Sequence, residues 1–309
     1  MKHSLSKPSR YEWGILWMLI SATALSISFL FLKITLAYMD YFTLIFLRFS
    51  VPFLFVLALL LIRWEWRFLF VSPNIRLQLL RAFCVVIAQY GVAYYISSNS
   101  LLNATVLLNA SPLFIPLIAW IFQGHRLGKS TMVGVSVAFL GMILVLHPDS
   151  TLLSTVSLIG LLAAVAQAGS QVLYGLKSKK ENLLVSLFYL FFFTTLVSGI
   201  IALWMSYSEK WPTEQPLEPA PVEFLGLSVV LMAVGTLCNQ YFRGLAYRYG
   251  SPTTLATFLY FSVFVSALLD WLIFKHTPIF LTVIGGCLII LGGILKVFLR
   301  SRILKKKGK

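Results

Sequence analysis

Polar side chains are rare inside the long apolar segments of this chain, and those that occur follow helical spacing. Gln167, Gln171 and Tyr174 stand at i, i+4 and i+7, which places them on one face of a helix. Because an unpaired polar group is costly in lipid, such residues normally face the interior of a helical bundle or a water-filled cavity. We therefore expect these side chains to bind a small polar molecule rather than to catalyse a reaction.

Other apolar segments contribute polar residues in related positions. The pair Gln89-Tyr90 recurs 151 residues later as Gln240-Tyr241, and Arg243 follows in the same segment. The alternative is that these side chains only bridge helices, each contributing about 0.6 kcal/mol. The residues expected to bind the molecule are Gln89, Tyr90, Tyr94, Asn109, Gln167, Gln171, Tyr174, Asn239, Gln240, Tyr241, Tyr260, Ser262 and Asp270.

The charge and the aromatic rings of this set suggest what it binds. Asp270 would attract a cation or titrate as a proton site, or else reach water at the interface or pair with Lys275. The tyrosine rings could add cation–π contacts of ~2 kcal/mol, or simply pack. Arg48 would meet a carboxylate of the molecule, or instead extend to the interface or pair with Asp40.

Composition places these residues in a membrane. The chain has 59% hydrophobic residues, 11% charged residues and a mean hydropathy of +0.88, which excludes a soluble domain. Its apolar runs of about 20 residues match a bilayer core of ~30 Å. The net charge of +15 does not indicate nucleic-acid binding, because the basic residues flank apolar runs instead of lining one folded face.

The gaps between apolar runs predict an all-α integral membrane protein with ten transmembrane helices. Basic residues follow every second segment and precede the first, which predicts that both termini are cytoplasmic. The predicted helices are Trp13–Leu36, Thr43–Ile62, Ile75–Ser97, Leu101–Phe122, Thr131–Leu146, Leu158–Leu176, Leu183–Ser206, Glu223–Leu245, Thr253–Phe274 and Pro278–Leu299.

The offset of 151 residues predicts two repeats of five helices each. It also relates Trp120 to Trp271 and the pair Gly134/Gly141 to Gly285/Gly292. We place the repeats at residues 13–147 and 158–299, followed by a basic cytoplasmic tail at 300–309. An odd number of helices per repeat makes the two repeats inverted, as in secondary carriers. The alternative is chance similarity between apolar helices.

Motifs of other functional classes are missing from the sequence. There is no phosphate-binding glycine loop, nucleophile elbow or paired-carboxylate motif, and no His, Cys and carboxylate set has metal spacing. We therefore expect no enzyme activity, no cofactor and no metal. The glycines of the fifth and tenth segments are expected to serve helix packing or a dimer surface, so the chain is predicted to be a monomer or a homodimer.

Short motifs recur near the ends of the apolar segments. They are Leu47-Arg48-Phe49, Leu80-Arg81-Ala82, Asn103-Ala104-Thr105, Ser111-Pro112-Leu113-Phe114 and Gly250-Ser251-Pro252. With the ten-segment plan, they resemble the EamA family of the drug/metabolite transporter superfamily, over about Gly14 to Val297. His125 and His276 stand where that family usually has Glu, which removes any role tied to that acid. The ninth segment from Tyr260 to Phe274 is similar to S-adenosylmethionine carriers of the family.

The resemblance implies a multi-pass secondary transporter of the inner (plasma) membrane. It would move a small polar metabolite, an amino acid or a related amine or sulfonium compound, by alternating access, with a proton or a counter-substrate as partner. The alternatives within this class are S-adenosylmethionine uptake or exchange and export of drugs or metabolites. Outside it, the alternative is a membrane-embedded lipid-modifying enzyme, which would need titratable residues clustered near one membrane face.

Overall fold

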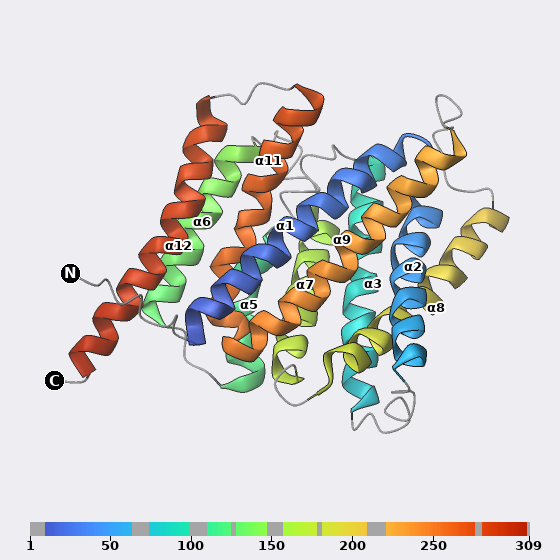
Figure 1. Ribbon diagram of the computed structural model, residues 1–309. Helices are drawn as coiled ribbons and strands as arrows, with labels where there is room; N and C mark the ends of the chain where they lie inside the picture. The colour runs from blue at the N-terminus through green and yellow to red at the C-terminus, as the bar shows by residue number, and fades with distance from the viewer. Residues whose placement is uncertain are drawn as a thin grey trace, which may run out of the picture.

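The computed structural model describes residues 10–63, 74–98, 110–124, 128–146, 157–177, 181–208, 221–275 and 280–307. Within these ranges, all regular structure is helical (Figure 1). The helices are α1 (Arg10–Leu36), α2 (Tyr41–Ile62), α3 (Ile75–Ser98), α5 (Ser111–Gln123), α6 (Lys129–Leu146), α7 (Ser157–Lys177), α8 (Leu183–Ser208), α9 (Val222–Tyr249), α10 (Pro252–Leu255), η3 (Ala256–Tyr260), α11 (Phe261–Phe274) and α12 (Phe280–Lys307).

Within the described residues, the predicted apolar segments are helical; of the fourth, the structure describes only the part from Ala110 onward. Six helical stretches of the described residues are long and apolar enough to cross a membrane, and three shorter apolar helices accompany them. The outer faces of the helices expose large aliphatic and aromatic side chains, such as Leu203 and Trp204 on α8. A lipid environment explains such exposure better than water does. The expectation of an all-helical, multi-pass membrane protein is therefore confirmed.

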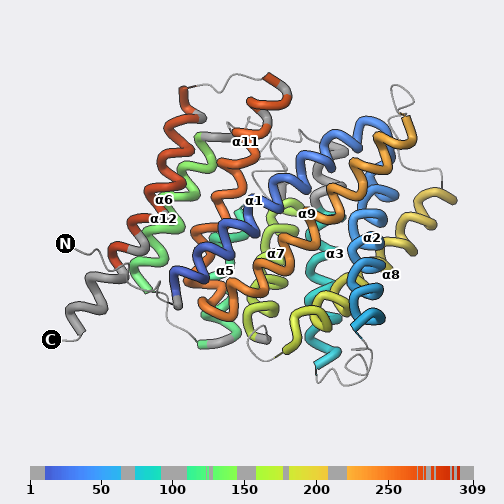
Figure 2. The backbone as a smooth tube through the Cα atoms, in the orientation of Figure 1, coloured from blue at the N-terminus to red at the C-terminus, as the bar shows by residue number. Residues whose placement is uncertain are grey.

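Helices from the first and second parts of the chain are interleaved. α1 packs along α9 and α3 along α7, while α2 lies against α8 and α6 against α12 (Figures 1 and 2). The smaller contacts are reciprocal as well, because α1 with α11 is matched by α5 with α7, and α3 with α8 by α2 with α9. The core therefore forms between the two parts of the chain instead of within each part.

The ninth predicted segment is continuous in the sequence but broken in the structure. Gly250 is extended, and Ser251 then caps a new helix by accepting a hydrogen bond from the backbone N–H of Thr254 at 3.2 Å. Pro252 occupies the first helical turn, where its missing N–H costs nothing. The chain continues as α10, the 3₁₀-helix η3 and α11, so the tighter turn of η3 lies inside the apolar segment.

Basic residues gather at the helix ends on one side of the bundle. Arg63 follows the end of α2, Lys129 begins α6 and Arg248 lies in the last turn of α9, all at the lower side of Figure 1. Asp40 caps the start of α2 and Glu223 lies in the first turn of α9, both on the upper side. We refer to the lower side as the basic side.

Glycines bring α6 and α12 close together. A Cβ atom added to Gly141 would lie 2.6 Å from the backbone oxygen of Gly285, and one added to Gly292 would lie 2.8 Å from that of Gly134. The glycine faces of the two helices therefore contact each other within one chain. Of the two roles expected for these glycines, helix packing is the one they fulfil here.

We expect Gly141→Ala to destabilise the protein by about 1–3 kcal/mol, because the added methyl group forces two closely packed backbones apart. The check is thermal unfolding of purified protein in nanodiscs. Gly226→Ala is the matched control, since nothing lies within 4 Å of the position where its Cβ would be, in the interior of α9. It should leave the unfolding temperature unchanged or raise it. Equal unfolding temperatures for the two variants would contradict the proposed contact.

Candidate functional site

Arg81 of α3 is the centre of a buried polar cluster that joins α3 to α7, α8 and α9. Its guanidinium lies over the ring of Tyr174 on α7, with Cζ 3.4 Å from the ring centroid. Nη1 donates to the hydroxyl of Ser186 on α8 at 3.2 Å, and Nη2 donates to the side-chain oxygen of Gln240 on α9 at 3.0 Å. With only 2% of its surface exposed, Arg81 is removed from solvent.

A second group of hydrogen bonds extends this cluster toward the basic side. The side-chain amide of Gln78, one turn before Arg81 on α3, donates to Glu181 at 2.8 Å and to the hydroxyl of Ser186 at 2.9 Å. Arg248 donates to the backbone oxygen of Glu181 at 3.2 Å. These contacts connect the start of α3 with the residues that precede α8.

The third part of the cluster lies between α7 and α9. Gln240, Arg243 and Tyr247 occupy successive turns on one face of α9. The hydroxyl of Tyr174 donates to the backbone oxygen of Gln240 at 3.0 Å, and that of Tyr247 donates to the side-chain oxygen of Gln171 at 3.1 Å. The rings of Tyr174 and Tyr247 meet edge to face at 5.9 Å. Arg243, 3% exposed, is therefore enclosed by the same two helices.

Several buried polar atoms of the cluster lack a hydrogen-bond partner among the described residues. An unsatisfied buried group costs about 1–3 kcal/mol, so a concentration of them at one place indicates a site for water or a ligand. The atoms are Arg81 Nε, Arg243 Nε, Gln78 Oε1, Gln167 Oε1 and Glu181 Oε1.

Four residues of the set predicted from the sequence belong to this cluster or to its helix faces. Tyr174 and Gln240 contact Arg81 directly, Gln171 accepts from Tyr247, and Gln167 lies one turn from Gln171 on α7. The helical stripe on α7 and one member of the repeated Gln-Tyr pair thus come together. We name Gln78, Arg81, Gln167, Gln171, Tyr174, Glu181, Ser186, Gln240, Arg243 and Tyr247 the arginine cluster.

Other predicted residues contact different parts of the fold. Tyr90 stacks on Phe42 of α2 at 5.8 Å and donates to the backbone oxygen of Ser198 on α8. Asn239 donates to the backbone oxygen of Ser21 on α1 at 2.8 Å, so its side chain is directed to α1, away from Gln240. These hydrogen bonds and ring contacts hold helices together.

The remaining described members lie in separate surroundings. Gln89 is buried, and its backbone oxygen accepts from the hydroxyl of Tyr41 at 3.2 Å. The hydroxyl of Ser262 donates to the backbone oxygen of Leu259 within its own helical segment. Tyr241 packs with apolar side chains, and the buried hydroxyl of Tyr260 has no partner among the described residues.

Three predicted residues lie outside what the structure describes. Asn109 falls in the gap before α5, and only the backbone is described at Tyr94 on α3 and Asp270 on α11. Their roles therefore stay predictions.

Arg48 lies outside the arginine cluster, seven residues into α2, and its partner Thr236 is one turn before Gln240 on α9. Its guanidinium covers the ring of Phe29 at 4.7 Å, and Nε donates to the hydroxyl of Thr236 at 3.3 Å. Asp40 accepts from the backbone N–H of Thr43 and caps α2. Arg48 is 3% exposed, so its side chain points into the bundle and does not extend to the interface or pair with Asp40.

Sequence reasoning missed several members of the arginine cluster. Gln78 and Arg81 stand at i and i+3 on α3, a spacing that could have marked a polar face continuing toward Gln89. Arg243 was noted in the sequence beside Gln240 but not counted among the binding residues, although the two share a face of α9. Glu181 and Ser186 have no signal of this kind, because they lie at the end of an apolar segment and only the packing of α8 brings them to Arg81.

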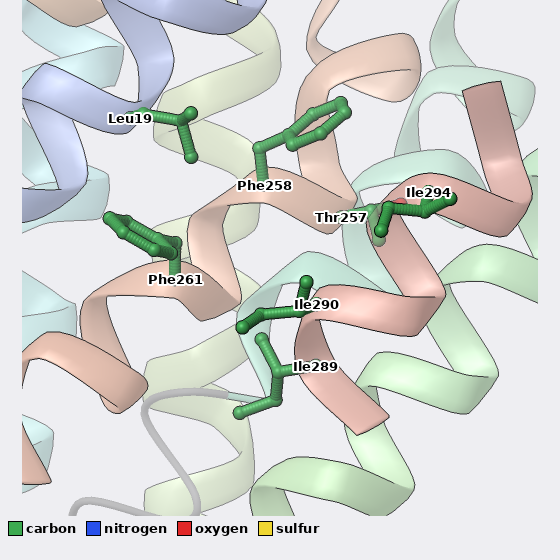
Figure 3. A pocket seen from close by; sticks show the side chains of 7 residues that line it. All are labelled: Leu19, Thr257, Phe258, Phe261, Ile289, Ile290 and Ile294. Carbon is green, nitrogen blue, oxygen red and sulfur yellow. The ribbon is translucent and has the colours of Figure 1, made fainter. Parts of the chain in front are cut away.

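A separate pocket of about 260 Å³ lies between α1, the broken ninth segment and α12 (Figure 3). Figure 3 shows that apolar side chains dominate its wall. This lining suits hydrocarbon and offers little to orient a polar molecule. The lining residues are Leu19, Thr257, Phe258, Phe261, Ile289, Ile290 and Ile294.

The chemistry of the arginine cluster is that of binding. Its members supply guanidinium and amide donors, a carboxylate and aromatic rings. No group of three or more metal-ligating residues occurs within the described parts of the chain. The expectation of no metal or cofactor stays a prediction.

Comparisons with known proteins agree with this picture. The EamA-like transporter family matches twice, at residues 12–147 and 154–298. A pseudopaline exporter of Pseudomonas aeruginosa is 30% identical over 66% of this chain and 69% of its own length. An S-adenosylmethionine uptake transporter of Rickettsia felis is 24% identical over 75% and 74%, and a riboflavin transporter of Rhizobium johnstonii is 27% identical over 67% and 66%.

A solved crystal structure shares the fold, with a TM-score of 0.77 at 17% sequence identity, over 95% of this chain and 99% of the other. The two family matches together span nearly the whole chain, and the named relatives are transporters, which argues against an enzyme. The membership expected from the short motifs is confirmed: the chain belongs to the EamA-like transporter family.

Proposed function

We propose that the protein is a secondary carrier that moves a small polar metabolite across the inner membrane by alternating access. The observation that carries this proposal is the arginine cluster, a group of buried polar side chains with unpaired atoms inside an apolar helical bundle. Polar groups inside a membrane protein are costly and mark substrate pathways. The cluster also joins α3 to α7, α8 and α9, so a ligand there would contact helices from both parts of the chain.

We further infer that the chain consists of ten transmembrane helices in two inverted repeats, at residues 13–147 and 158–299. The reciprocal contacts support this arrangement, because the largest pairings between the two parts have counterparts with the roles exchanged. The two family matches support it as well. In carriers of this design, the two repeats rock against each other around a site near the middle of the membrane.

The substrate class follows from the same residues and from the relatives. An amino acid or a related amine or sulfonium compound remains our proposal, with S-adenosylmethionine exchange and metabolite export as alternatives suggested by the relatives' names. Asp270 is proposed to bind a cationic group or a coupling proton. From the charge bias, we propose that both termini are cytoplasmic, and that the carrier acts as a monomer or a homodimer. A lipid-modifying enzyme is the less favoured alternative, because the described residues place their polar groups inside the bundle.

Gln240→Ala should lower uptake at least about tenfold, because it removes a charge-assisted hydrogen bond that holds Arg81. The measurement is counterflow in proteoliposomes with labelled amino acids, S-adenosylmethionine and riboflavin, using whichever of these the unaltered protein transports. Asn239→Ala changes the neighbouring residue, whose side chain bonds α1 instead. It should reduce thermal stability and affect uptake far less. If Gln240→Ala leaves uptake undiminished, the arginine cluster is not part of the substrate pathway.

The proposed orientation predicts that the two ends of α9 are accessible from opposite sides of the membrane. In a background without Cys84, Cys238 and Cys287, Glu223→Cys should react with an impermeant thiol reagent from the periplasmic side only. Arg248→Cys, at the other end of the helix, should react from the cytoplasmic side only. Both positions are exposed, so burial does not limit either reaction. Labelling of both from the same side would rule out the proposed threading.

A further inference from the structure

Two buried arginines of the arginine cluster lie near the basic-side ends of their helices. Arg81 is six residues after the start of α3, and Arg243 is six residues before the end of α9. Both of these helix ends are on the basic side, and at 1.5 Å per residue each arginine is about 9 Å along its helix from that end. Gln240, whose side chain accepts from Arg81 at 3.0 Å, lies one turn before Arg243 on the same face of α9, so the two arginines lie in the same region of the cluster.

The described part of the arginine cluster contains one carboxylate, Glu181, against these two positive charges. The hydrogen bonds of Arg81 go to a hydroxyl and an amide oxygen, which are neutral acceptors. Glu181 bonds the side chain of Gln78 and not an arginine of the pair. Because removing like charges from water without a full counter-charge is unfavourable, at least one of the two positive charges has no balancing negative charge in the cluster.

The pair also has unused hydrogen-bonding capacity. The Nε atoms of Arg81 and Arg243 are both buried without a partner among the described residues. A guanidinium presents planar N–H donors whose spacing matches the two oxygens of a carboxylate or a phosphate. An oxyanion between the two residues would supply acceptors for these donors and the missing negative charge.

The surroundings favour the bound group being part of a larger molecule. The edge-to-face rings of Tyr174 and Tyr247 adjoin the pair and present apolar surface as well as hydroxyl groups. Gln167, with an unpaired buried side-chain oxygen, lies farther along the polar face of α7. These groups could contact the remainder of a metabolite whose anionic end is held at the arginines.

We propose that Arg81 and Arg243 form a binding site for the anionic group, a carboxylate or a phosphate, of the transported molecule. This inference rests on the carrier function proposed above. It restricts the substrate to molecules that carry such a group, and it separates the anion site near the basic side from Arg48, which lies outside the arginine cluster.

The test compares matched ligands that differ in one anionic group. The carboxylate arm uses histidine against histamine and S-adenosylmethionine against its decarboxylated form. The phosphate arm uses riboflavin 5′-phosphate against riboflavin. Binding to the purified full-length protein in nanodiscs is measured by titration calorimetry or by thermal stabilisation. In at least one pair, the anionic member should bind at least about tenfold more tightly. The arm that shows the preference identifies the anion.

Variants then test whether the arginines cause the preference for the anionic ligand. Arg243→Gln should abolish the difference between the two members of the pair, and Arg243→Lys should restore only part of it, because lysine keeps the charge but lacks the planar set of donors. Arg76→Gln is the matched control: it removes the same charge from an exposed position on α3, the helix of Arg81, outside the arginine cluster. It should leave the preference intact.

Three results would overturn the inference: no binding of any anionic probe, equal binding within every pair, or a preference that persists in both Arg243→Gln and Arg81→Gln. The comparison within each pair uses the unaltered protein, so it tests the preference for an anionic ligand even if the arginine variants do not fold. If the protein shows counterflow of amines without any preference for anions, the proposed carrier function is retained and only the anion site is rejected. Absence of counterflow for every probe would instead count against the carrier.

Discussion

A guanidinium group enclosed by an apolar helical bundle must find its acceptors among the helices that surround it. Arg81 finds a ring on α7, a hydroxyl on α8 and an amide on α9. Because the cost of an unpartnered charge is high in such a medium, these contacts restrict how α3 can sit relative to three other helices. The placement of the second part of the chain around α3 depends on this restriction, and so does the polar interior that we propose as the substrate pathway.

The rest of the bundle is held by a different interaction. α6 and α12 approach through glycines, with spacing that leaves no room for another Cβ atom, and their contact is apolar. Close backbone packing of this kind needs neither charge nor water, and it is the common means of association between helices in lipid. The polar core and the glycine contact thus lie in different parts of the molecule.

Neighbouring residues in the sequence can have unrelated roles, as α9 illustrates. Asn239 and Gln240 are adjacent, yet one bonds the backbone of α1 and the other bonds Arg81 of α3. On a helix, successive side chains point about 100° apart, so two adjacent polar residues face different neighbours. The residue types alone indicate that both are buried and bonded. The partner of each depends on which helix packs on which face, and that is decided by contacts between distant parts of the chain.

The sequence by itself determined the family, the helical class and the apolar segments that the described residues show as helices, because a bilayer demands runs of apolar residues whose length and flanking charges can be read locally. It also marked the stripe of Gln167, Gln171 and Tyr174, since helical periodicity is local. Only the tertiary structure decided that Arg81 and Arg243 share this region, that Glu181 and Ser186 join them, and that the ninth segment bends through η3. Those features depend on contacts between helices more than a hundred residues apart. The residue pattern of a single helix does not indicate such contacts.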